Sequence, residues 1–135
     1  MTLSFPFQKE KPLLFGNTYR PIAKVSFWSR KFNIWDEITM IVDTGADYIV
    51  LSHYLAEELG IDLEQGCSVF YTSGVGGKEI VYVLEKQRVK LGKWEREIPV
   101  GFLEKDTIPP LMGRQLFLET FESHFSKSHV VSFSE

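Results

Sequence analysis

The stretch from Ile41 to Asp47, with the sequence IVDTGAD, constrains the fold most, because it places an acid directly behind an apolar run. The run from Met40 to Val42 is continuously apolar, as in a strand that is buried on both faces. A carboxylate is rarely buried there without a purpose. Gly45 lets the chain turn sharply, so we expect the strand to end at Asp43 and to leave that side chain facing a cavity.

The size and composition of the chain predict one compact domain. The 135 residues are 44% hydrophobic and 14% aromatic, which is enough for one real core, and we expect a single domain spanning residues 1–135. The net charge is −3, and basic and acidic residues are interspersed. This pattern provides no polybasic face, so we expect neither nucleic-acid binding nor attachment to an anionic membrane.

The chain lacks the usual marks of a secreted or membrane protein. Its single cysteine, Cys67, has no partner for an internal disulfide or a CxxC metal site. The N-terminus has no basic segment ahead of a long apolar core, and no apolar run is long enough to span a bilayer. We therefore expect a soluble, cytoplasmic protein.

Apolar runs of strand length predict a mainly β fold. Residues 2–15 form an extended arm in this interpretation, ending in a turn at Gly16-Asn17. Pro99 indicates an edge or a bulge in its strand. The expected strands are 21–27, 34–42, 48–51, 69–71, 80–84, 86–91, 95–102 and 129–133.

Two short helices are expected among these strands. The first begins after Ser52, a plausible N-cap, and is stopped by Gly60. The second is predicted from Phe117, Phe121 and Phe125, which recur every four residues. The last strand, 129–133, then has no remaining segment of its own chain that must pair with it.

The glycine-rich segment Thr72–Gly77 is predicted to be the tip of a hairpin. A phosphate-binding loop is the rival interpretation, but it requires glycine where Thr72 stands and serine or threonine where Glu79 stands. The segment also lies between two predicted strands and does not open a helix. The hairpin interpretation is therefore favoured.

Three motifs together resemble a known family. Asp43-Thr44-Gly45, the Gly74–Gly77 tip and Leu111-Met112-Gly113-Arg114 occur in the same order in retropepsins. The chain resembles a retropepsin-like aspartic protease over roughly Lys24 to Phe125. The resemblance implies a closed, barrel-like, mainly β fold with a glycine-rich flap hairpin, which would hydrolyse a peptide or protein substrate without a cofactor.

The single Asp-Thr-Gly motif indicates a shared site. Hydrolysis of an amide by water requires one carboxylate to take the proton of the water and a second acid to protonate the carbonyl oxygen. The nearest internal candidate, Asp106-Thr107-Ile108, lacks the glycine and the preceding apolar strand. We therefore expect a homodimer in which symmetry brings two copies of Asp43 together. Retropepsin dimers are commonly sealed by strands from both termini, a role open to residues 130–133.

The resemblance also implies roles for individual residues. The catalytic motif would be Asp43, Thr44 and Gly45, with Thr44 bracing the two active-site loops across the dimer. Substrate would be bound by Asp47 and by the hairpin tip, Gly74, Val75, Gly76 and Gly77. Structural support would come from Ala46, Gly113 and Arg114, the arginine pairing with Asp47 within the subunit.

Two alternatives were weighed against this interpretation. A metal site built from Asp43, Asp47 and His53 has no recognised ligand spacing, so we expect no metal. A non-proteolytic dimeric module that binds peptides or assembles a complex on the same fold is the other alternative. The intact Asp-Thr-Gly motif favours the enzyme, because a pure binding module has no use for two buried acids that repel each other.

Overall fold

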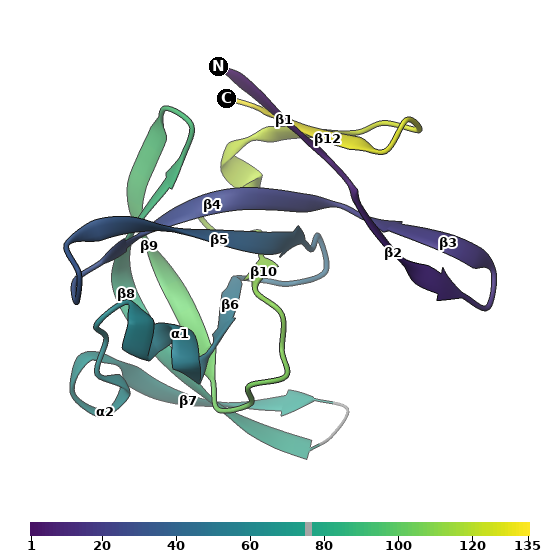
Figure 1. Cartoon of the computed structure of the whole chain (residues 1–135). Helices are drawn as coiled ribbons and strands as arrows, with labels where there is room; N and C mark the ends of the chain where they lie inside the picture. Colours follow the sequence, from purple (N-terminus) through teal and green to yellow (C-terminus); the bar gives the residue numbers. More distant parts are fainter. Residues whose placement is uncertain (75–76) are drawn as a thin grey trace.

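The computed structural model describes residues 1–74 and 77–135, and strands dominate it (Figure 1). The strands are β1 (Thr2–Pro6), β2 (Gln8–Leu13), β3 (Gly16–Arg20), β4 (Ile22–Ser29), β5 (Ile34–Val42), β6 (Ile49–Ser52), β7 (Ser68–Gly74), β8 (Gly77–Leu91), β9 (Trp94–Leu103), β10 (Leu111–Met112), β11 (Glu122–Phe125) and β12 (Val130–Ser134). The helices are α1 (His53–Glu58), α2 (Leu63–Gly66) and the 3₁₀ turn η1 (Leu118–Thr120).

The largest sheet closes on itself. Its strand order is β4-β5-β10-β6-β9-β8-β7, and β4 also pairs with β8 through Ser26 opposite Lys90 and Phe27 opposite Val89. This second pairing joins β4, the first strand of the order, to β8, the last but one, and so closes a ring of six strands. Strand β7 lies outside the ring, paired only with β8. The mainly β, barrel-like fold is therefore confirmed.

The β4–β5 hairpin and the short strand β10 hold the end of β5 in place. The hairpin pairs continuously from Ile22 opposite Ile41 to Ser29 opposite Ile34, as predicted. Strand β10 inserts between β5 and β6, parallel to β5 and antiparallel to β6. It therefore brings the segment after residue 110 against both strands that flank the loop 43–48.

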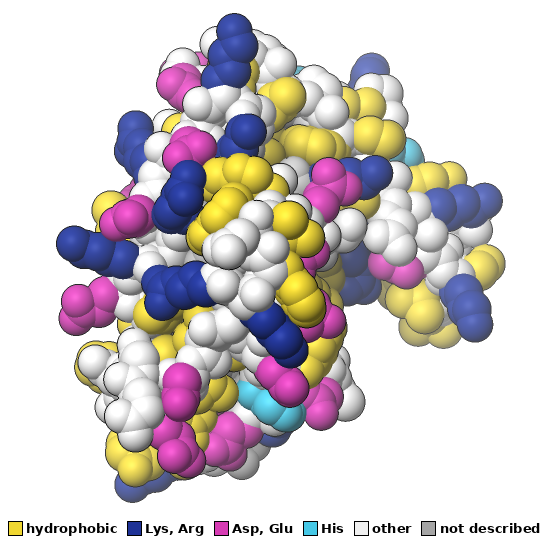
Figure 2. All heavy atoms as spheres, turned by 60° about the vertical axis from the view of Figure 1, so that its left-hand side comes forward, with side chains coloured by type: hydrophobic (Ala, Val, Ile, Leu, Met, Phe, Trp, Pro, Cys, Tyr) yellow, Lys and Arg dark blue, Asp and Glu magenta, His cyan; other side chains and the backbone are white. Residues whose placement is uncertain are grey.

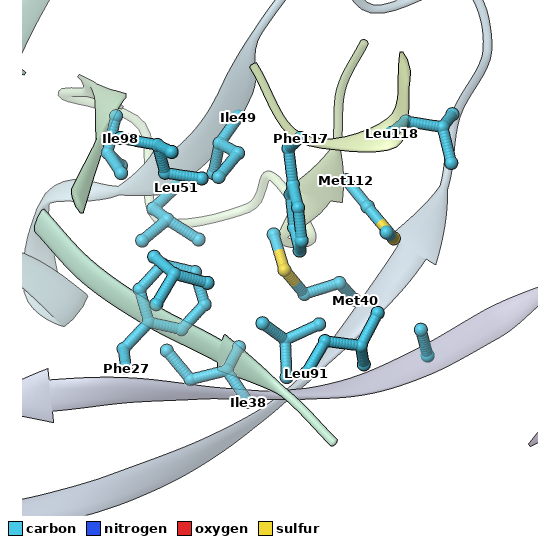
Figure 3. Close-up of a cluster of buried hydrophobic side chains, with 14 of the residues drawn as sticks. Phe27, Ile38, Met40, Ile49, Leu51, Leu91, Ile98, Met112, Phe117 and Leu118 are labelled. Carbon is cyan, nitrogen blue, oxygen red and sulfur yellow. The ribbon is translucent and has the colours of Figure 1, made fainter. Parts of the chain in front are cut away.

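The core fills the interior of this closed sheet. Along β4 the residues alternate between inward and outward positions, and Ala23, Val25 and Phe27 are fully buried, as a half-buried strand requires. Figure 3 shows Phe27, Met40 and Leu91 among the buried side chains that face one another across the sheet. Large side chains from β4, β5, β6, β8, β9, β10 and β12 meet here, so the core ties these strands into one packed unit.

Strand β8 is longer than the sequence indicated. The two predicted strands 80–84 and 86–91 form one strand, interrupted by a register shift between Leu84 and Gln87. Leu84 pairs with Val100 and Gln87 pairs with Ile98, so two residues of β8 oppose Pro99 alone. Proline lacks the N–H that a regular ladder would use there. The predicted bulge at Pro99 is confirmed.

The prediction of a helix through Phe117, Phe121 and Phe125 is wrong. The segment contains only η1 and then β11, and Leu116 has a positive φ of 58° that ends any helical path before Phe117. Phe117 and Phe121 are buried against Trp94, with ring centroids 5.2 Å away in each case. The four-residue spacing therefore reflects packing on one tryptophan, while Phe125 is exposed in β11.

The expectation that the last strand has no partner in its own chain is also wrong. Strand β12 lies between β1 and β11, antiparallel to both, with Phe133 opposite Leu3 and Ser123. The two termini therefore lie side by side in one sheet (Figure 1). Sequence patterns did not reveal this pairing because the two strands come from opposite ends of the chain.

The helices are short and local. Helix α1 follows Ser52 as predicted, although the serine hydroxyl makes no capping hydrogen bond, and Gly60 ends it with a positive φ of 74°. Helix α2 was not predicted, and it is capped by Asp62, whose carboxylate accepts from Glu64 N and Gln65 N. None of the helices in the described residues has the length and apolar character to cross a lipid bilayer.

The stacking on Trp94 should contribute strongly to stability. Phe117 is fully buried, so we expect Phe117→Ala to lower the free energy of unfolding by about 3–5 kcal/mol through lost apolar contact and the cavity left behind. Urea unfolding would measure the loss. Phe32→Ala, at an exposed position, is the matched control and should change stability by less than about 0.5 kcal/mol. Equal effects would contradict the packing argument.

Candidate active site

Asp43 begins the loop that follows β5. Its backbone N–H donates to Met112 O at 3.1 Å, which attaches the start of the loop to β10. The residue is half-buried and directly follows Val42, the buried last residue of β5. The strand before it alternates between buried and more exposed positions, so the expected burial of both faces is not found. The structure therefore ends the strand at this acid, as predicted, and leaves the acid at the edge of the core and open to solvent. The cavity described below is lined by other residues, so the expectation that Asp43 faces a cavity is not confirmed.

The turn at Gly45 holds the Asp43 carboxylate. Gly45 N donates to Asp43 Oδ1 at 2.9 Å, and Ala46 N donates to Asp43 O at 3.2 Å. A Cβ on Gly45 would lie 3.2 Å from the same carboxylate oxygen, closer than an ordinary contact. Glycine therefore leaves room for the hydrogen bond that fixes the orientation of this acid, while Thr44 at the tip of the turn is exposed.

Asp47 and Arg114 form the predicted pair. Arg114 Nη2 donates to Asp47 Oδ1. The backbones of the same two segments are also joined, since Arg114 N donates to Ala46 O at 3.0 Å and Gln115 N to Asp47 O at 2.7 Å. The two side chains are 51% and 65% exposed, so water screens the ion pair and its main effect is to orient Asp47.

Gly113 lies against the backbone of Tyr48. A Cβ at this position would lie 2.0 Å from Tyr48 O and 2.2 Å from Tyr48 C, distances that no side chain tolerates. The close approach lets the segment after β10 run directly beneath the loop 43–48. Gly113 thus permits this close approach through its lack of a side chain.

The glycine-rich segment caps a hairpin. Strands β7 and β8 pair from Ser68 opposite Val83 to Gly74 opposite Gly77, and Gly77 has a positive φ of 104° that favours glycine. The hairpin extends from the body of the molecule (Figure 1). Val75 and Gly76, which the sequence assigned to substrate binding, lie outside the described residues.

The candidates His53 and Asp106 contact each other and make no contact with the Asp43 turn that the structure records. His53 Nδ1 lies 3.0 Å from Asp106 Oδ1, so two residues considered for a metal site and for a second acid contact each other. Within residues 1–74 and 77–135, no group of three or more acidic, histidine or cysteine side chains is arranged to hold a metal ion.

The sequence of the chain matches a described family of proteases. The family is the aspartyl proteases, and the match covers residues 32–116, more than half of the chain. The chain belongs to the aspartyl protease family. The matched range includes Asp43 and Arg114, and the prediction of an aspartic endopeptidase of the retropepsin type is confirmed at this level.

Solved structures show that this aspartyl protease shares its fold with retropepsins. A retropepsin-like aspartic protease from Rickettsia conorii superposes with a TM-score of 0.66 at 22% identity, covering 96% of this chain and 97% of that one. The EIAV protease, solved with the inhibitor HBY-793, gives 0.55 at 18% identity, covering 75% and 88%. No match was found among curated protein sequences.

A cavity next to the site was missed by the sequence interpretation. Its volume is about 390 Å³, and its lining is mostly apolar: Tyr48, Phe70, Tyr71, Thr72, Val81, Val83, Pro99, Val100, Gly101 and Gln115. The residues come from the site loop, from both strands of the β7–β8 hairpin, from β9 and from the segment after β10. The one signal for this cavity in the sequence was the pair of neighbouring aromatic residues, Phe70 and Tyr71. The structure leaves both side chains exposed on β7.

Tyr48 connects this cavity with the acidic loop. Its ring lies over Gly101, where a Cβ would lie 2.7 Å from Tyr48 Cε2. Burial raises the pKa of Tyr48 above its ordinary value, and the nearby carboxylates of Asp47 and Glu79 raise it further. The phenol therefore stays protonated and neutral through the acidic and neutral pH range.

The close approach at Gly113 should make this position intolerant of any side chain. We expect Gly113→Ala to lower the free energy of unfolding by about 3 kcal/mol or more, because its Cβ would overlap backbone atoms. Denaturant unfolding measures the change. Gly66→Ala is the matched control, since nothing lies within 4 Å of its Cβ, and it should leave stability unchanged or raise it by up to about 1 kcal/mol.

Proposed function

We propose that residues 1–135 form one domain that works as a homodimeric aspartic endopeptidase, with Asp43 of each subunit supplying half of the catalytic pair. The observation that carries this proposal is the Asp43 turn, where a half-buried carboxylate that directly follows β5 is oriented by Gly45 N at 2.9 Å. The family match over residues 32–116 supports it.

The paired carboxylates divide the chemistry between them. Two such groups in hydrogen-bond reach share one proton, because ionising both is costly. The ionised member takes a proton from water, which attacks the peptide carbonyl, while the protonated member donates its proton to the carbonyl oxygen. Collapse of the tetrahedral intermediate then breaks the C–N bond. The carboxyl that took the proton of the water passes it to the leaving nitrogen, and the other carboxylate takes a proton back from a hydroxyl of the intermediate, so the pair again holds one proton.

The substrate is bound as an extended strand under the β7–β8 hairpins of the two subunits, which act as flaps. The Gly45 carbonyl and Asp47 bond the main chain of the peptide from below. The glycines of the tip, Gly74, Gly76 and Gly77, offer backbone N–H groups from above, and Val75 covers an apolar subsite.

The remaining motif residues keep this arrangement in place. Thr44, exposed at the tip of the turn, braces the turn of the partner subunit. Arg114 orients Asp47 through the observed ion pair. Ala46 and Gly113 join the two segments, the first through the Arg114 N–H bond at 3.0 Å and the second through its contact with Tyr48.

Asp43→Asn should abolish cleavage and keep the fold. An amide neither takes the proton of the water nor repels its symmetry mate, so activity on a peptide library should fall by about 10³-fold or more with stability unchanged or slightly raised. Asp106→Asn is the matched control, and its activity should stay within about twofold of wild type. Wild-type protein that dimerises but cuts no peptide or denatured protein at acidic or neutral pH would overturn the proposal.

The pH profile of cleavage should be bell-shaped and shifted to acid. At low pH both carboxylates of the pair become protonated and the base is lost, whereas at high pH both become ionised and the acid is lost. Steady-state rates measured across buffers of about pH 4–9 test this, together with a check that the fold persists. A flat profile over that range would contradict the shared-proton mechanism.

A further inference from the structure

The hairpin of β2 and β3 ends in an unusually exposed apolar tip. Leu13, Leu14 and Phe15 are 66%, 88% and 96% exposed. The turn is completed by Gly16, whose φ of 93° favours glycine. Three consecutive large apolar side chains in water are unfavourable, and such a patch usually marks a contact surface.

The two strands behind this tip are also open to solvent. No residue of β2 or β3 is fully buried, and the pair forms a separate sheet. A two-stranded hairpin of this kind is at best marginally stable alone in water. The hairpin therefore gains most if another surface covers it.

The base of the hairpin is nevertheless fixed to the body. Phe7 N donates to His129 O at 2.8 Å, and the Tyr19 ring stacks on the His129 ring with centroids 4.0 Å apart. Across the strands, Arg20 Nε lies 3.3 Å from Glu10 Oε1. The direction of the tip is thus set in the subunit, so little ordering is required when it binds.

The hairpin projects on the side of the molecule on which the proposed homodimer places the second subunit. In Figure 1 the β2–β3 hairpin and the β7–β8 hairpin both extend beyond the body to the right, and the loop that follows β5 lies on that same side. Figure 2 shows the first hairpin as a lobe that projects from the body and carries apolar and charged side chains. A partner that faces Asp43 would lie within reach of this lobe.

The terminal strands β1 and β12 are already paired within the chain. The whole of β1 pairs with β12 of its own chain, from Thr2 opposite Ser134 to Pro6 opposite Val130. The serine and threonine hydroxyls of the two strands also meet, as between Ser4 Oγ and Ser132 Oγ at 2.8 Å. An interface formed by exchange of terminal strands would require this pairing to be broken first.

We infer that the β2–β3 hairpin is the dimerisation arm, which grips a second copy of this chain through Leu13, Leu14 and Phe15. This inference rests on the proposed homodimer and names the surface that assembles it. In a two-fold dimer each arm contacts the other subunit, so every tip contact occurs twice. A lipid surface is a weaker fit, since Arg20 is paired with Glu10 and only Lys9 and Lys11 remain as basic residues of β2, fewer than such binding uses.

The test compares oligomeric state between two double variants. Leu14→Asp with Phe15→Asp removes the apolar tip, while Phe32→Asp with Ile34→Asp makes the same change at residues that are 59% and 55% exposed, at the opposite end of the β4–β5 hairpin (Figure 1). Sedimentation velocity over a concentration series gives each dimer dissociation constant. We expect the dimer dissociation constant of the tip variant to be at least about 100-fold that of wild type, roughly tenfold for each of the two substituted residues. The control variant should have the dissociation constant of wild type.

Three results would overturn the inference. These are an unchanged dissociation constant in the tip variant, a wild type that stays monomeric, and lipid-vesicle binding that the tip mutations abolish without affecting dimerisation. Circular dichroism and the melting temperature establish that the variant is folded, and Leu14→Ser provides a milder change if it is not. Asp43→Asn protein should dimerise like wild type, so failure of the catalytic proposal and failure of the arm are distinguished.

Discussion

The backbone contact between Gly113 and Tyr48 is the constraint on which the site depends. Three hydrogen bonds surround it, from Asp43 N to Met112 O, from Arg114 N to Ala46 O and from Gln115 N to Asp47 O. Each contributes a modest net amount, about 0.5–1.5 kcal/mol, but together they fix the loop from both sides. The loop is therefore held by β5, β10 and β6, so the Gly45 N–H bond to Asp43 Oδ1 only has to orient the carboxylate on a backbone that is already fixed.

Local patterns in the sequence predicted those elements that local forces determine. The apolar runs within 21–27 and 34–42 correctly indicated the strands β4 and β5, Gly60 marked the end of α1, and Pro99 marked its bulge. The prediction of a helix near the C-terminus failed because Phe117 and Phe121 pack on Trp94, a residue more than twenty positions away. Spacing alone does not distinguish a helical stripe from two aromatics packed on one tryptophan.

The active site likewise contains one contact that the sequence predicted and one cavity that it did not. The order of three short motifs predicted that Asp47 and Arg114 would meet, 67 residues apart, and the structure brings them together. The cavity beside Tyr48 was not predicted, because it forms only when β7, β8 and β9 are aligned and Gly101 leaves space for the ring. Most of the residues that line the cavity look like ordinary strand residues in the sequence. They face one cavity only because of the register in which the strands pair.

Pairing of β1 with β12 changes how folding and assembly are related. A dimer that exchanges its terminal strands has subunits whose stability is inseparable from protomer concentration. Here the terminal sheet is completed within the chain, and Phe133 is fully buried with its ring 5.9 Å from Phe121 and 6.1 Å from Phe5. The core is thus closed before any partner arrives. Association would then control only whether two Asp43 carboxylates meet, so activity can depend on concentration while the fold of each subunit does not.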